Sequence, residues 1–254
     1  METFSDELIS LLADYVHNVG QNLSERAREI IMHITPEDIC KTVETIRSEV
    51  QGFTALHVAL VRDHPEVIEL LINSVTHADR RLLLRHVNIL GRTTVHCAAR
   101  KGDTRTMEFL LNSMKPEDRI QVLITQSVSG NTAAHCASRK CHTDTLQCML
   151  HYLTDEERFQ LMKIRNGGGN TAMHCAAGSN HTSVFQLVVS ALSQERSLTL
   201  FSICNKDGQN ALDVALEHKS NEAAEFIRQR RGLMAARPKQ TPRRGKADSK
   251  LIVL

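Results

Sequence analysis

The chain has 254 residues with a formal net charge of +2, and 41% of its residues are hydrophobic, which is ordinary for a globular protein of one large domain or two small ones. Aromatic residues make up 4% and Trp is absent, so aliphatic side chains and Cys must fill the core, which favours helices packed on helices over a β-sandwich. No apolar run approaches the length of a membrane-spanning helix, and the acidic start of the chain lacks the basic region of a secretory signal, so neither feature is expected.

Residues 1–51 are predicted to form a divergent helical cap at the N-terminal end of the fold. Ser5 and Ser24 each precede an amphipathic stretch, as N-cap residues of helices do. The string Thr-Pro-Glu-Asp at 35–38 resembles Lys-Pro-Glu-Asp at 115–118, which lies within the repeats described next. The segment is therefore interpreted as a degenerate repeat, and a separate interaction domain is the alternative.

Five similar eight-residue strings follow, and each starts 39 residues after the one before. They are GFTALHVA, GRTTVHCA, GNTAAHCA, GNTAMHCA and GQNALDVA, starting at Gly52, Gly91, Gly130, Gly169 and Gly208. The glycine suits a turn with positive φ, and the Thr or Asn two residues later suits the N-cap of a helix. The Ala that ends each string allows the first helices of neighbouring repeats to approach closely. These features predict five repeats over residues 52–231.

The strings resemble the T-P-L-H-x-A signature of ankyrin repeats. Two differences stand out: Ala or Thr replaces Pro in every repeat, and the period is 39 residues rather than 33. The resemblance implies an all-α solenoid of helix–turn–helix units with β-hairpin tips, whose tips and first-helix ends line a concave binding surface. It also implies local hydrogen bonds near the turn for the signature histidines, His57, His96, His135 and His174.

The six extra residues of each repeat predict a short additional helix. Each copy has a capping residue or Lys, then one or more acidic residues, and then an apolar pair, a pattern typical of a helix start and its buried stripe. The predicted helices lie near residues 77–86, 116–125, 155–164 and 194–203.

The residues give no indication of catalysis. Three His-Cys pairs, at 96–97, 135–136 and 174–175, recur because the repeat recurs. Packed helices lie about 8–10 Å apart, whereas zinc holds its ligands within about 2.0–2.3 Å, so equivalent pairs cannot share one ion. The glycines at 167–169 are not followed by the Lys of a phosphate-binding loop. We expect neither an enzyme nor a bound cofactor or metal.

The predicted binding surface is basic over the first three repeats. Its expected partner-binding residues lie at tips and at first-helix ends: Arg62, Arg92, Arg100, Lys101, Asn131, Arg139, Lys140 and Asn170. Arg and Lys at a helix C-terminus also interact favourably with the helix dipole, which is the structural alternative. The leading hypothesis is a scaffold or adaptor that binds an acidic or phosphorylated protein segment, because Arg offers paired, charge-assisted hydrogen bonds.

Residues 232–254 are rich in Arg, Lys, Pro and Gly and are predicted to be a disordered basic tail. From Arg228 onward there are nine Lys or Arg and one Asp, a charge of +8, so the remainder carries −6 and is interpreted as an acidic body. The alternative function is binding of nucleic acid or an anionic membrane, or nuclear targeting, through this tail. Its residues are Arg228, Arg230, Arg231, Arg237, Lys239, Arg243, Arg244 and Lys246.

The seven cysteines are an odd number in a chain long enough to bury a core, which argues against a disulfide framework. A reducing compartment, the cytoplasm or the nucleus, is therefore expected. A capped solenoid also predicts a monomer.

Overall fold

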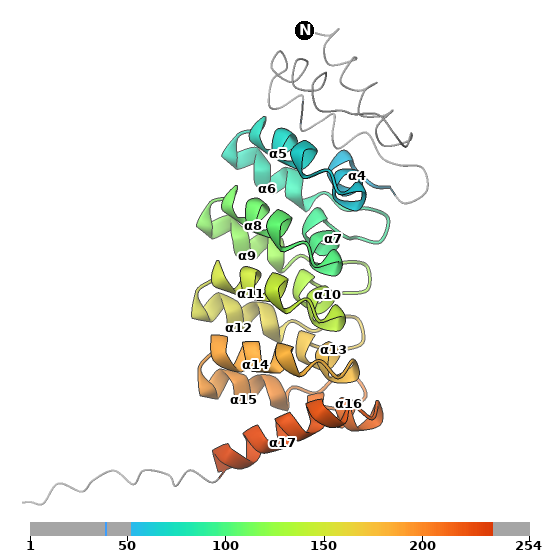
Figure 1. Cartoon of the computed structure of the whole chain (residues 1–254), viewed down its shortest axis with the longest axis vertical. Helices are drawn as coiled ribbons and strands as arrows, with labels where there is room; N and C mark the ends of the chain where they lie inside the picture. The colour runs from blue at the N-terminus through green and yellow to red at the C-terminus, as the bar shows by residue number, and fades with distance from the viewer. Residues whose placement is uncertain (1–38, 40–51, 236–254) are drawn as a thin grey trace, which may run out of the picture.

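The structure is a computed structural model that describes residue 39 and residues 52–235. In the part of the chain that it describes there are 14 helices, α4–α17, and no strand. The helices form one elongated stack (Figure 1), in which the first helices and the loops beside them line one side and the other helices line the opposite side. The fold is thus an all-helical solenoid, as predicted. The predicted cap at 1–51 lies outside the described residues, apart from Ile39.

The first helices of the repeats begin directly after the Thr or Asn of each signature string. In α7, the Thr93 side chain accepts a hydrogen bond from the His96 backbone N–H, and Asn210 caps α16 in the same way. The Ala that ends each string has no exposed surface in any repeat, so neighbouring first helices pack through small side chains. These helices are α4 (Ala55–Arg62), α7 (Thr94–Lys101), α10 (Ala133–Lys140), α13 (Ala172–Gly178) and α16 (Ala211–Glu217).

The second helices fill the core with their larger apolar side chains. Phe185 of the fourth repeat is fully buried, with its ring centroid 6.0 Å from those of Phe201 and Phe226. Pro65 lies at the first position of its helix, where its missing N–H costs nothing. The second helices are α5 (Pro65–Asn73), α8 (Thr104–Asn112), α11 (Thr143–His151), α14 (Thr182–Ala191) and α17 (Asn221–Ala235).

The additional helix predicted in each 39-residue unit is present and ends one or two residues earlier than expected. The third helices are α6 (His77–Arg85), α9 (Pro116–Leu123), α12 (Asp155–Lys163) and α15 (Gln194–Ser202). An Arg on three of them satisfies the carbonyl groups at the end of the preceding second helix. The Nε–H groups of Arg80, Arg119 and Arg158 donate to Ile72, Leu111 and Leu150 over 2.7–3.0 Å.

The same Arg column also joins one repeat to the next. A terminal nitrogen of Arg80 donates to the Ser113 carbonyl over 2.9 Å, and one of Arg158 donates to the Ala191 carbonyl over 3.3 Å. In the fourth repeat the column holds Ser197 instead. The third helices therefore contribute to the interface between repeats as well as to the packing within each one.

The β-hairpin tips are not confirmed. We call the loops at 88–92, 127–131, 166–170 and 205–209 the tips; each is a tight turn closed by backbone hydrogen bonds, such as that from Asn88 N–H to the Arg92 carbonyl at 3.0 Å. One backbone bond joins each tip to the next, as from Val128 N–H to the Leu90 carbonyl at 3.0 Å. Such single bonds tie neighbouring loops together without the consecutive pairing that makes a strand ladder.

The last helix, α17, continues to Ala235, four residues beyond the boundary expected at Arg231. The apolar spacing of Ala223, Ala224 and Ile227, all buried, ends near the predicted boundary, but the helix needs no further apolar residue to complete another turn. The remaining tail, residues 236–254, lies outside the described part of the chain.

Gly130 and Gly208 provide a matched test of how closely the tips pack. Both have positive φ, at 74° and 77°, but a Cβ on Gly130 would lie 2.5 Å from the Gly167 backbone nitrogen, whereas one on Gly208 would meet nothing within 4 Å. Gly208→Ala should cost about 1–2 kcal/mol of unfolding free energy from backbone strain. Gly130→Ala should cost at least about 1 kcal/mol more, measured by urea denaturation. Equal losses would show that tip packing does not contribute.

Candidate functional site

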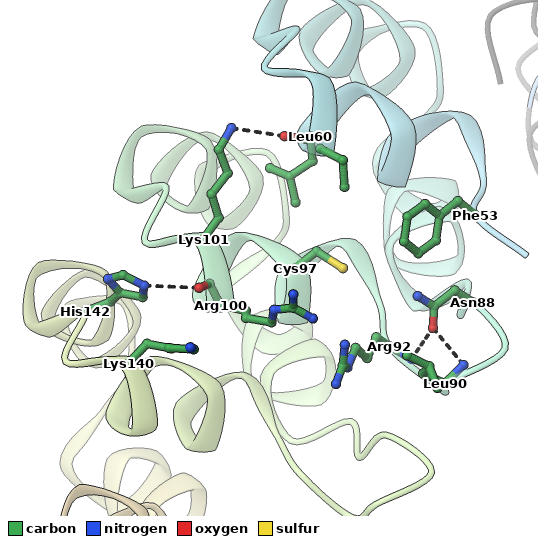
Figure 2. A pocket seen from close by; sticks show the side chains of 11 residues that line it. Phe53, Leu60, Asn88, Leu90, Arg92, Cys97, Arg100, Lys101, Lys140 and His142 are labelled. Atoms are coloured by element: carbon green, nitrogen blue, oxygen red, sulfur yellow. Dashed lines mark hydrogen bonds between the residues drawn. The ribbon is translucent and has the colours of Figure 1, made fainter. Parts of the chain in front are cut away.

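A hollow lies between the first three repeats on the side of the tips (Figure 2). This N-terminal hollow has a volume of about 890 Å³. It is lined by residues of α4, α7 and α10, by the first tip and by the start of the second helix of the third repeat: Phe53, Leu60, Val61, Asn88, Leu90, Arg92, Cys97, Arg100, Lys101, Lys140 and His142. Four of the eight residues predicted to bind a partner therefore come together here.

The local sequence explains how these four basic side chains meet. Arg100 and Lys101 end α7, and Lys140 ends α10 one repeat further on. Arg92 follows Gly91 in the first tip, where the Asn88 side-chain oxygen holds the loop by accepting hydrogen bonds from the Leu90 and Arg92 N–H groups, both at 3.0 Å. The 39-residue period places all of them on one side of the stack.

The four basic side chains differ in what they already contact. The Lys101 ammonium donates to Asp63 at 2.7 Å and to the Leu60 carbonyl at 3.1 Å, and this hydrogen bond is the main reason that the pKa of Asp63 lies below its usual value. Between residues 52 and 235, no carboxylate forms an ion pair with Arg92, Arg100 or Lys140. Three positive charges in the hollow are thus available to a partner, whereas Lys101 binds groups at the end of α4.

The rest of the N-terminal hollow is mainly apolar, with Asn88 and His142 as its other polar side chains. Leu90 and Val61 are exposed over 43% and 58% of their surface, although both are large hydrophobic residues. Burial raises the pKa of Cys97 to about 11, and this effect outweighs the opposite influence of Arg92 and Arg100. The thiol is therefore neutral at physiological pH and contributes apolar surface rather than a nucleophile.

A second hollow lies further along the same side of the stack. This C-terminal hollow has a volume of about 360 Å³. It contains Arg139 and Asn170, two more of the predicted residues, and Arg139 contacts the Cys175 sulfur at 3.3 Å. Its lining is Arg139, Asn170, His174, Cys175, Gly178, Ser179, Asn205, Asp207, Gln209, Val214, Glu217 and His218.

The remaining predicted residues have structural contacts or lie elsewhere. The side-chain oxygens of Asn131 and Asn170 accept hydrogen bonds from the amides of Asn166 and Asn205, at 2.9 and 3.0 Å, so both join one tip to the next. Arg62 ends α4 but lines neither hollow. Of the tail residues, Arg228, Arg230 and Arg231 lie on α17, and Arg230 lies over the Phe226 ring at 5.5 Å.

The interpretation of the body as acidic is wrong for the repeats. Residues 1–51 hold ten Asp or Glu and four Lys or Arg, whereas residues 52–227 hold 18 of each. The net negative charge therefore belongs to the N-terminal segment, and the repeats are neutral overall. The basic hollow is a local separation of charge within a neutral stack.

Comparison with known families identifies the family of the chain. A sequence model described as Ankyrin repeats (3 copies) matches residues 6–118 and 77–160. The chain belongs to the ankyrin repeat family. Ankyrin repeats generally mediate protein–protein interactions, and the family is typically non-enzymatic. A search of curated proteins found no match.

The signature histidines of this ankyrin stack are structural. His135 Nδ1 lies 2.8 Å from the Thr132 hydroxyl and accepts a hydrogen bond from the Thr132 N–H at 3.2 Å. Since that nitrogen is an acceptor, Nε2 carries the proton and donates to the Asn170 carbonyl of the next repeat at 2.9 Å. The sequence suggested the local bond but missed the one between repeats. Burial lowers the pKa of His135 to about 4, which keeps the ring neutral.

Two further observations concern the remaining classes of site. No group of three or more His, Cys, Asp or Glu side chains within the described ankyrin stack is placed to hold a metal ion. Its helices are also too short or too polar to cross a membrane, as far as the structure describes them. The two hollows are where the residues predicted to bind a partner gather on this stack.

Proposed function

We propose that this ankyrin stack is a non-enzymatic scaffold or adaptor that binds an acidic segment of another protein in its N-terminal hollow. The observation that carries the proposal is the combination of Arg92, Arg100 and Lys140 without ion-pair partners in the described chain and exposed apolar side chains beside them. A carboxylate supplied by a partner would gain charge-assisted hydrogen bonds, and an apolar side chain next to it would cover Leu90 and Val61.

A phosphorylated residue is the other form of negative charge that this hollow could bind. Arg side chains pair with phosphate as well as with carboxylate. Phosphatase treatment of the captured partner separates the two forms: affinity survives the treatment when carboxylates carry the charge and falls when phosphate does.

The test is a charge reversal that spares the side chains with structural contacts. Arg100→Glu combined with Lys140→Glu should reduce the recovery of specific partners from a lysate at least about tenfold, because attraction becomes repulsion at two positions. Lys101 and Arg139 are left unchanged, since Lys101 holds the end of α4 and Arg139 contacts Cys175. Quantitative mass spectrometry of the captured proteins gives the readout.

A matched control carries the same number of charge changes on the third helices. Glu117 and Glu195 are exposed on α9 and α15, away from the tips (Figure 1), and Glu117→Lys with Glu195→Lys should leave capture intact. Equal recovery by the reversed hollow and by this control would refute the proposal, provided that circular dichroism shows both variants folded.

The basic tail provides the second candidate function. Residues 236–254 carry six Lys or Arg and one Asp, and we propose that they serve as a nuclear-import signal or bind a polyanion. Fusion of this segment to a fluorescent protein tests the first possibility, and loss of salt-dependent DNA binding on truncation after Ala235 tests the second. The cytoplasmic or nuclear location and the monomeric state stay predictions.

A further inference from the structure

The two hollows occupy equivalent positions of the stack, three repeats apart, and the residues that line them differ in charge. Nine residues of the N-terminal hollow have a counterpart 117 residues later, three periods of 39, and eight of the nine counterparts line the C-terminal hollow. Asn88 corresponds to Asn205, which keeps the turn in both tips. The other seven pairs are Phe53 and Asn170, Val61 and Gly178, Leu90 and Asp207, Arg92 and Gln209, Cys97 and Val214, Arg100 and Glu217, and Lys101 and His218.

Charge therefore changes sign along one continuous side of the stack. The position of Arg100 at the end of the first helix holds Arg139, Gly178 and Glu217 in the following repeats. The position of Lys101 holds Lys140, Ser179 and His218 in the same order. Arg139 lines one hollow and its neighbour Lys140 lines the other, so the end of α10 contributes to both hollows.

The tips change in the same direction. The position of Leu90 holds Ser129, Gly168 and Asp207 in successive tips, which takes the surface from apolar through small to anionic. Asp207 and Glu217 are exposed, and neither forms an ion pair within residues 52–235. The C-terminal hollow thus presents two negative charges where the N-terminal hollow presents an apolar and a positive group.

From this pattern we infer that the groove formed by both hollows binds one extended protein segment in a single orientation. The acidic and apolar residues of the segment lie over α7 and α10, and a Lys or Arg of the same segment lies over Asp207 and Glu217. The inference rests on the proposed function and adds a second determinant to it. A nucleic acid would place phosphates along the whole groove and would be repelled at its C-terminal end, which favours a peptide with both charges.

The geometry of the stack sets the spacing of the two charges. Arg100 and Glu217 occupy equivalent positions three repeats apart, and packed helices lie about 8–10 Å from one another, so the two side chains are separated by roughly 24–30 Å. An extended chain advances about 3.3–3.6 Å per residue. The basic residue of the partner is therefore expected about 7–9 positions from the acidic residue that contacts Arg100.

The inference is tested by selecting random displayed peptides with the full-length protein and three variants. One variant carries Asp207→Lys and Glu217→Lys, a second carries Arg100→Glu and Lys140→Glu, and the third is the third-helix control, Glu117→Lys with Glu195→Lys. The wild type and the control should enrich peptides with an apolar and acidic cluster and, about 7–9 residues away on a constant side, a Lys or Arg. The first variant should keep the cluster and lose the basic residue.

A selected peptide then allows a quantitative check by fluorescence anisotropy. Changing its basic residue to Ser should weaken binding to the wild type about tenfold, because two exposed attractions are lost, and should not weaken binding to the Asp207→Lys, Glu217→Lys variant. This pairing of protein and peptide changes separates a direct contact from a loss of folding.

Each outcome has a distinct meaning. Acidic peptides without a positioned basic residue would overturn the inference and leave the proposed function standing, as would a basic preference that survives in the Asp207→Lys, Glu217→Lys variant. Peptides that are acidic along their whole length would show a uniformly polyanion-binding groove, which also overturns the inference. Equal enrichment of acidic peptides by the Arg100→Glu, Lys140→Glu variant, or no enrichment by the wild type, would refute the proposed function itself.

Discussion

Replacement of Ala137 by glutamate is expected to divide the thermal unfolding of the protein into two transitions. Ala137 has no exposed surface and lies in α10, which packs against both α7 and α13. A longer side chain there must displace a neighbouring helix, at about 1–3 kcal/mol, and an unpaired buried carboxylate adds about 3–5 kcal/mol. Because stability in repeat proteins sums over units and their interfaces, the repeats on either side should then unfold separately in calorimetry.

Two related changes define the cause of this effect. Ala137→Ser nearly preserves the volume and should shift the single transition by a few degrees at most. Ala78→Glu places the same carboxylate at an exposed position near the start of α6, where it should leave the melting temperature almost unchanged. One sharp transition at the wild-type temperature in Ala137→Glu would contradict close packing of the first helices.

The second large effect concerns pH and His135. The unfolded chain binds a proton on this residue with an ordinary pKa near 6.5, whereas burial holds the folded pKa at about 4. Between these values the unfolded state carries more protons, so the free energy of unfolding falls as the pH decreases from about 6.5 to about 4. His135 alone should account for a loss of about 2 kcal/mol between pH 7 and pH 5, and burial moves the pKa of His96 and His174 in the same direction.

Urea denaturation at several pH values measures this contribution, and one variant isolates it. His135→Leu should be less stable at pH 7, since the bond to the Asn170 carbonyl is lost, but its stability should depend less on pH by about 2 kcal/mol over the same interval. His151→Gln, at an exposed position at the end of α11, is the control and should retain the wild-type slope. Parallel slopes for His135→Leu and the wild type would show that this histidine does not couple protonation to folding.

The regular parts of the fold were predictable because each depends on contacts close in the sequence. Thr93 and the turn at Gly91 define where α7 begins, and Thr154 with its first-turn carboxylates defines α12. The tips were less predictable, since a strand needs consecutive hydrogen bonds between neighbouring loops, and the structure has one backbone bond from each tip to the next. The end of α17 was missed because helix propensity without an apolar stripe gives little signal.

The candidate site was predictable in composition and not in detail. The 39-residue register was sufficient to bring Arg92, Arg100 and Lys140 to one surface. It could not show that Lys101 is held by Asp63 or that Asn131 accepts a hydrogen bond from Asn166, because these contacts depend on side-chain direction between repeats. The charge inversion was visible in the sequence, through the 117-residue correspondence. Its relevance to binding follows only from the structure, which shows that both sets of residues line hollows.

The interfaces between repeats affect how the protein can discriminate among partners. Hydrogen bonds cross each interface at separate places: one between the tips, one from the histidine at the start of the first helix and, in two repeats, one from the Arg of the third helix. Because these hydrogen bonds do not lie on one line, neighbouring repeats cannot rotate relative to each other about any one of them. The interval between the two hollows is then a fixed length, and selectivity depends on the span of a partner as well as on its charge.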